Sequence, residues 1–292
     1  MGFLYEIQER IKTMKRLLAT TALLAVLTTP VMADVTIGGD MEWSYQDNDG
    51  TTSTAMDGDI NFVAKTTTDT GLTFGADFNI NQAGADDGGN SLTISNDQFK
   101  LDLGDVDSAL DAIDDKTDFT YVLGNGSPSA NHSSILSLSP ITGLTLNISN
   151  ATGTDYGTAA KEGYAYSGTY AIGSIATVGA GQMKNADDTE ATLMNVTGAL
   201  GPIGLAYEIH TDTTAAGVDT DTTTMGATYT IDALKVGVET MKAESAGTVS
   251  SDEITFGAQY TVAPGLVAFA EMTEDDKTAS EKTTAIGLAV KF

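Results

Sequence analysis

Apolar and polar side chains alternate along most of the chain with a period of two residues. In the first clear example, Val35, Ile37, Met41, Trp43 and Tyr45 share one parity, and Thr36, Asp40, Glu42 and Ser44 share the other. The alternation returns over residues 72–80, 203–209 and 254–262. Because successive side chains of a β-strand point to opposite faces, this pattern predicts strands with one apolar and one polar face. It indicates an all-β protein.

Segments of turn-forming residues separate the predicted strands and divide into short links and longer polar loops. The short links lie at residues 67–71, 96–97, 139–143, 171–174, 201–202, 232–233 and 263–265. The long loops lie at residues 47–57, 82–89, 105–132, 151–161, 185–188, 211–219, 243–250 and 274–279. This alternation predicts an antiparallel barrel of about 16 strands with both termini on the side of the short links. Within it, residues 92–95 and 133–139 carry the weakest strand pattern.

The predicted barrel suits a membrane because its charges keep to one parity. Asp40, Glu42, Asp77, Glu208, Lys235 and Glu239 all share the polar side of their strands. A lysine on the lipid face of a barrel would cost roughly 2–4 kcal/mol at the bilayer midplane, so charges belong inside. No apolar run reaches the eighteen residues that a membrane helix needs. An exported soluble or surface-layer adhesin, whose outward face would be the polar one, stays as the alternative.

The N-terminal residues have the organisation of an export signal rather than of a folded element. Met14, Lys15 and Arg16 precede an apolar run at residues 17–27, and Val31, Met32 and Ala33 supply a small-residue cleavage site. Residues 1–33 are therefore predicted to be upstream residues followed by a signal peptide that begins at Met14, with Met1 as the alternative start. Residues 34–292 form the single predicted domain.

Composition excludes several classes of function. Residues 1–33 hold four of the fourteen basic residues and two of the forty acidic ones, so the remainder carries a formal charge of −28 and contains no arginine. Such a chain would be repelled by nucleic acid, whose binding requires Lys and Arg. The absence of cysteine excludes disulfides, thiolate metal sites and a cysteine nucleophile.

The stretch 100–118 interrupts the strand pattern and is the strongest candidate for a site. The carboxylates that gather there are Asp105, Asp107, Asp111, Asp114, Asp115 and Asp118, and they alternate with apolar residues at roughly helical spacing. We predict an acidic loop with a short helical turn, and a solvated acidic loop without a specific role is the plain alternative. Asp105 and Asp107 begin like a calcium loop, but Ala109 and Leu110 stand where an EF-hand needs a ligand and a glycine. A shared Ca²⁺ at Asp105 and Asp107 remains open, with diffuse counterions as the simpler expectation, and no other cofactor is expected.

Three short motifs carry a resemblance to a known family. They are the closing strand at residues 285–292 with its terminal Phe292, the opening strand at residues 35–39, and the segment at residues 103–109 with its Gly-Asp-Val-Asp core. With the export signal, they resemble the general outer-membrane porins of Gram-negative bacteria, of the alphaproteobacterial type. The resemblance implies a passive channel for small hydrophilic solutes and ions, assembled as a homotrimer in outer-membrane lipid, with Phe292 as the assembly signal.

The resemblance also implies the geometry of the pore. The loop after the fifth strand, here residues 105–132, would fold into the barrel and present its acids to basic residues on the wall. This chain has only lysines for that role, at Lys65, Lys100 and Lys235, beside the wall acids Asp40, Glu42 and Asp77. Because fixed charge is focused in a narrow pore with low-dielectric walls, the excess of carboxylates predicts cation selectivity.

A barrel enzyme is the least favoured class. The only histidines are His132, in the predicted loop, and His210, at a strand end, and no nucleophile elbow, HExxH or Walker sequence occurs. A lone histidine beside serines is more often a polar loop residue than a general base. The chain is therefore predicted not to be an enzyme.

Overall fold

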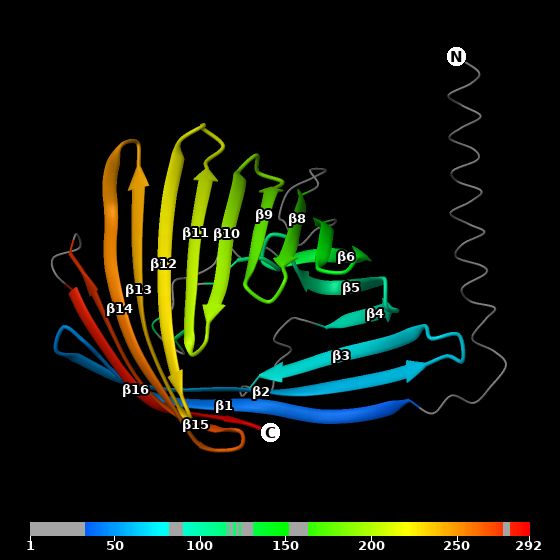
Figure 1. Ribbon diagram of the computed structural model, residues 1–292, viewed down its shortest axis with the longest axis horizontal. Helices are drawn as coiled ribbons and strands as arrows, with labels where there is room; N and C mark the ends of the chain where they lie inside the picture. Colours follow the sequence, from blue (N-terminus) through cyan, green and yellow to red (C-terminus); the bar gives the residue numbers. More distant parts are fainter. Residues whose placement is uncertain are drawn as a thin grey trace.

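The computed structural model describes residues 33–81, 90–114, 116, 119–120, 123, 131–151, 163–276 and 281–292, and these residues form one closed barrel of sixteen antiparallel strands (Figure 1). Residues 1–32 of the predicted export segment lie outside the described residues. The strands are β1 (Asp34–Asn48), β2 (Thr51–Thr67), β3 (Thr73–Asn81), β4 (Ser91–Ser95), β5 (Phe99–Asp107), β6 (Asn131–Ile141), β7 (Leu144–Ala151), β8 (Gly163–Ile172), β9 (Ala176–Lys184), β10 (Glu190–Leu200), β11 (Ile203–Thr213), β12 (Asp219–Ile231), β13 (Leu234–Ser245), β14 (Thr248–Ala263), β15 (Leu266–Asp275) and β16 (Glu281–Lys291). The predicted fold class and strand number are confirmed.

The barrel closes where the first strand meets the last. β1 pairs with β16 over nine residues, from Asp40 opposite Lys291 to Asn48 opposite Thr283. The Phe292 N–H donates to the Gly39 carbonyl at 3.0 Å, and the Gly39 N–H donates to the Phe292 carbonyl at 3.0 Å. Among the described strands, every strand has a paired neighbour on both sides, so the sheet has no edge strand, as a sheet inside a bilayer requires.

The outer face of the barrel is apolar and the inner face is polar. On β1, the outward side chains Val35, Ile37 and Trp43 are 66%, 62% and 41% exposed, whereas the inward Ser44 is 2% exposed. Residues that face each other across a pair of strands point to the same side, so the register carries this assignment around the barrel. Asp40, Glu42, Asp77, Glu208, Lys235 and Glu239 all lie on the inward parity, as predicted. An exposed apolar band of this kind contradicts the soluble alternative.

Three predicted long loops are wrong because the strands continue through them. β1 and β2 meet in a two-residue turn at Asp49 and Gly50, whose φ values of 48° and 84° fit a type I′ hairpin. The loop expected at residues 243–250 is likewise a tight turn at Ala246 and Gly247, and the loop expected at 211–219 shrinks to 214–218. These segments are rich in Thr and Ser and lack an apolar parity, so alternation did not reveal them as strand. A boundary of one short link also moves, since β6 runs to Ile141 and enters the link expected at 139–143.

No helix in the described ranges is long and apolar enough to cross a membrane.

Candidate pore constriction

The loop that follows β5 begins later than predicted. β5 continues to Asp107 and β6 begins at Asn131, so Asp105 and Asp107 lie on a strand rather than in the loop. Between the pairs Leu103–Ser134 and Val106–His132, two residues of β5 stand opposite one residue of β6. This bulge shifts the parity of the strand, and it turns Asp105 and Asp107 toward the barrel interior.

After β5, the chain makes a tight turn that Asp111 stabilises. Asp111 Oδ2 accepts a hydrogen bond of 2.8 Å from the backbone N–H of Ser108. The N–H groups of Ile113 and Asp114 donate to the carbonyls of Leu110 and Asp111, at 3.0 and 3.3 Å. The predicted short helical turn is therefore a run of turns over residues 109–113, and one predicted site acid serves as its cap.

This turn is anchored inside the barrel against β7 to β10. Leu110 and Ile113 are fully buried in a cluster with Ala109, Ala165, Met183, Ala191 and Leu193, all of them on inward positions of the wall or on the turn. Polar contacts fasten the backbone of the turn to the same wall. The Ala109 N–H donates to Ser149 Oγ at 2.7 Å, Ser167 Oγ donates to the Ala109 carbonyl, and Asn195 Nδ2 donates to the Ile113 carbonyl.

The described part of the loop then continues along the interior to β13, β14 and β15. Phe119 is 5% exposed, and Gln259 Nε2 on β14 donates to its carbonyl. Farther on, the Leu123 N–H donates to Glu271 Oε2 on β15 at 3.1 Å. The prediction that this loop folds into the barrel is confirmed for the described residues. They contact the wall at β7 to β10 and again at β13 to β15.

A cavity of about 580 Å³ lies between the start of the loop and the wall of β2 to β6. It brings together six predicted site residues, namely Lys65, Asp77, Lys100, Asp105, Asp107 and Asp111. Asp102, which was not predicted, also lines the cavity. Its Oδ2 forms an ion pair with Lys100 Nζ at 2.9 Å. Its position two residues from Lys100, on the same parity, was the sequence signal that could have identified it.

Other predicted residues lie elsewhere. Asp114 is 5% exposed and does not line the cavity, and Lys235 lies on the opposite wall with its ammonium 6.0 Å from the centre of the Phe119 ring. Asp115 and Asp118 are outside the described residues. Asp40 and Glu42 face the interior from β1.

A second group of acids on the inner wall escaped prediction. Asp59 stands directly opposite Asp40, and Asp57 stands directly opposite Glu42, on the lumen side of β1 and β2. Like charges in directly opposed positions repel, so this wall carries a concentrated negative potential. Asp57 had been placed in a loop at residues 47–57, which concealed the pairing. Among the described residues, no group of three or more His, Cys, Asp or Glu side chains is arranged to hold a metal ion, and Ca²⁺ at Asp105 and Asp107 stays a prediction.

The two histidines both lie in strands. His132 belongs to β6 and is 2% exposed, so its placement in a loop was wrong. His210 lies on the inner face of β11 with Nε2 3.3 Å from Asp212. A general base needs a nucleophile within hydrogen-bond reach, and no hydrogen bond found among the described residues joins either histidine to a serine or threonine hydroxyl.

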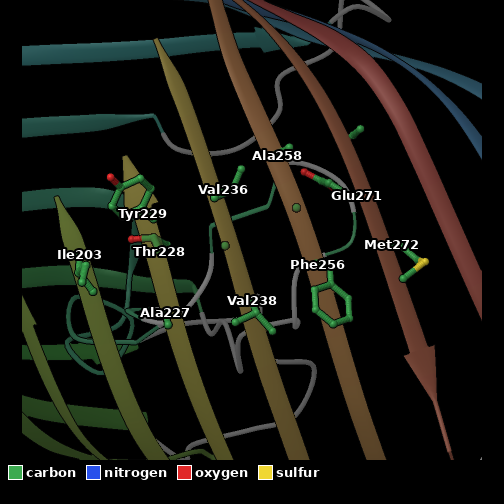
Figure 2. Close-up of a pocket in the computed structure, with 13 residues that line it drawn as sticks. Ile203, Ala227, Thr228, Tyr229, Val236, Val238, Phe256, Ala258, Glu271 and Met272 are labelled. Carbon is green, nitrogen blue, oxygen red and sulfur yellow. The ribbon is translucent and has the colours of Figure 1, made fainter. Parts of the chain in front are cut away.

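The outer surface of β12 to β15 bears a shallow apolar groove. Figure 2 shows Tyr229, Val236, Val238, Phe256 and Met272 around it, on β12 to β15, and all of them lie on the outward parity. The floor includes Gly237 and Gly257. This groove belongs to the apolar outer band and is separate from the charged cavity of the interior.

Comparisons with known proteins agree with this architecture. The profile of the Gram-negative porin family matches residues 19–286. A mutant of Rh. blastica porin with five substitutions superimposes with a TM-score of 0.73 at 18% identity, over 89% of this chain and 100% of that one. An outer membrane protein of Vibrio cholerae, OmpT without loop L8, gives a TM-score of 0.73 at 17% identity, over 89% and 99% of the two chains. No curated protein matches the chain in sequence.

Proposed function

Because this chain belongs to the Gram-negative porin family, we propose that it is a cation-selective diffusion channel for small hydrophilic solutes and ions. Family and fold together support an outer-membrane channel, and a barrel of sixteen strands is wide enough for an aqueous path. Transport through it is passive, without a coupled energy source, and no chemical step is assigned to its side chains.

One observation carries the proposal, namely that the described residues of the loop lie inside a closed barrel, against β7 to β10 and β13 to β15. The turn at residues 108–114 is fastened to β7, β8 and β10, and the charged cavity lies beside it against β2 to β6. We therefore place the water-filled path beside this cavity, along the wall of β1 to β6. Solutes are limited in size by the loop and sorted by the charges of that wall.

The charges of the path favour cations. Four acids of β1 and β2, in the two directly opposed pairs Asp40–Asp59 and Glu42–Asp57, face it from one side. Of the predicted basic residues, Lys100 is neutralised by its ion pair with Asp102, and Lys235 lies beside the Phe119 ring on the far wall. Lys65 is left as the main positive charge at the cavity. Low-dielectric walls focus the electric field of these excess carboxylates on the ions that pass.

The selectivity is testable by neutralising the paired wall acids. In the variant D40N/E42Q/D57N/D59N, the reversal potential measured across a KCl gradient should move toward zero. The unmodified protein should itself lose selectivity with salt, because the Debye length falls from about 10 Å at 0.1 M to about 3 Å at 1 M. The matched variant D47N/D49N removes carboxylates at the β1–β2 hairpin and should change the reversal potential little. Chloride preference in the unmodified protein would refute the charge argument.

We also infer assembly as a homotrimer, with the outer face of the terminal strands between subunits. Ile37, Met41 and Trp43 on β1 and Ile286 and Leu288 on β16 are at least two-fifths exposed, and none of them is charged. An apolar surface of this extent suits contact with another subunit as well as with lipid. The native mass of the protein in mild detergent should correspond to three chains, and a mass of one chain would refute the inference.

A further inference from the structure

Two adjacent glycines on the inner wall leave a small area of the sheet without side chains. Gly237 of β13 and Gly257 of β14 stand directly opposite each other, and both lie on the inward parity. Their neighbours on that parity are the pairs Lys235–Gln259 and Glu239–Thr255, which carry full side chains. Glycine within a strand normally weakens it, and it marks a place where another group comes close to the backbone.

The group that occupies this area is the ring of Phe119 from the loop. A Cβ built on Gly237 would come within 2.7–2.9 Å of three ring carbons, and a Cβ built on Gly257 within 2.7 Å of one of them. Real Cβ atoms do not approach carbon so closely, so the ring fits only because both side chains are missing. An aromatic ring that covers strand glycines also restores the packing that they lack.

Polar contacts from the adjacent pair hold the same residue. Gln259 donates to the Phe119 carbonyl, and the Lys235 ammonium lies 6.0 Å from the centre of the ring, at the limit of a cation–π contact. The four residues Gly237, Gly257, Lys235 and Gln259 thus form a two-by-two patch that receives both the ring and the backbone of Phe119. We call this patch the Phe119 seat.

On the outer side of the Phe119 seat, only the backbone of the sheet lies behind the ring. Gly237 and Gly257 also form part of the floor of the groove seen in Figure 2, so a single layer of backbone separates Phe119 from the membrane side. Val236, Val238 and Phe256 project outward around that floor. A methyl group added at Gly237 would meet the Phe119 ring at 2.7–2.9 Å, so the ring would have to move away from the wall, toward the lumen.

We propose that Phe119 in this seat is a positioning residue that fixes how far the loop stands from β13 and β14, and so sets the free cross-section of the channel. It acts as a second anchor, about a third of the barrel away from the hydrophobic cluster at Leu110 and Ile113. The inference rests on the proposed channel function.

The experiment is a cycle of the variants G237A, F119A and F119A/G237A, each measured as single-channel conductance in planar bilayers. G237A should lower the conductance, because the added methyl displaces the ring and its loop into the path. F119A should increase open-channel noise and partial closures, because the loop loses its second anchor. In the F119A background, G237A should have no effect on conductance, since no ring remains to be displaced.

Matched controls separate this effect from general damage. G204A adds a methyl to another lumen-facing glycine, where the Cβ meets only Thr228, with its Oγ1 2.6 Å away; a change of the Thr228 rotamer relieves this contact without moving the loop, so conductance and noise should stay unchanged. Heat-modifiable mobility in unboiled gel samples reports whether each variant has folded. If G237A does not fold, F119A decides the matter alone. Unchanged noise in F119A, or an undiminished effect of G237A in the F119A background, would overturn the inference. Absence of any conductance in the unmodified protein would instead refute the proposed function.

Discussion

Replacing Leu110 with aspartate is expected to release the loop from the wall and to raise the single-channel conductance, with a large increase in open-channel noise. Leu110 is fully buried against Met183 and Leu193, and the wall at Gly181 is shaped to receive it, because a Cβ there would lie 2.8 Å from Leu110 Cδ1. Loss of a buried leucine costs about 2–5 kcal/mol, and burial of an unpaired carboxylate adds to that cost.

The barrel itself should survive this change because its sixteen strands pair independently of the turn. Heat-modifiable mobility should therefore be unchanged. The control is A112D, which adds the same charge to the same turn at an exposed position and should leave the loop in place. Equal noise in L110D and A112D would show that the cluster at residues 109–113 does not hold the loop.

Deleting Phe292 is expected to remove most of the assembled protein from the outer membrane of cells. The residue closes the seam between β1 and β16 with two backbone hydrogen bonds to Gly39, each 3.0 Å long. Such bonds contribute only about 0.5–1.5 kcal/mol each, net of the bonds to water that they replace, so their loss should not unfold the barrel. A large loss in cells would therefore come from recognition of the terminal aromatic during assembly.

Two measurements separate recognition from stability. The protein without Phe292 should refold in detergent and show normal heat-modifiable mobility, while its amount in outer-membrane fractions falls. F292Y keeps a terminal aromatic and should restore the amount, whereas F292A should not. Equal amounts of the unmodified and truncated proteins in these fractions would contradict the proposed role of Phe292.

Strand number and sidedness could be predicted from the sequence because they depend on local alternation. A barrel wall in a membrane must present apolar side chains outward and polar ones inward, and the parity of Val35, Asp40 and Trp43 expresses that requirement directly. The hairpins at residues 49–50 and 246–247 were missed because the threonines and serines beside them do not alternate with apolar residues, so they mark neither an apolar nor a charged face. In these segments the backbone register alone identifies the strand.

The acidic composition of the segment predicted where the site lies, but it did not predict the structural role of each residue. Six loop acids were grouped together, yet two lie on β5, Asp111 caps a turn and Asp114 is buried. The turn needs an acceptor for its backbone N–H groups, and its apolar side chains decide which face of it packs against the wall. Neither requirement can be read from the density of carboxylates along the sequence. Phe119 gave no signal, since Gln259, which bonds its carbonyl, is 140 residues away along the chain.

The reversal potential of the purified protein in a planar bilayer shows most directly whether this loop-narrowed barrel conducts ions and prefers cations. With a tenfold KCl gradient at low ionic strength, discrete channels should appear, and their reversal potential should have the sign of potassium preference. A membrane that stays non-conducting, or a reversal potential with the sign of chloride preference, would show that the protein is not a cation-selective channel.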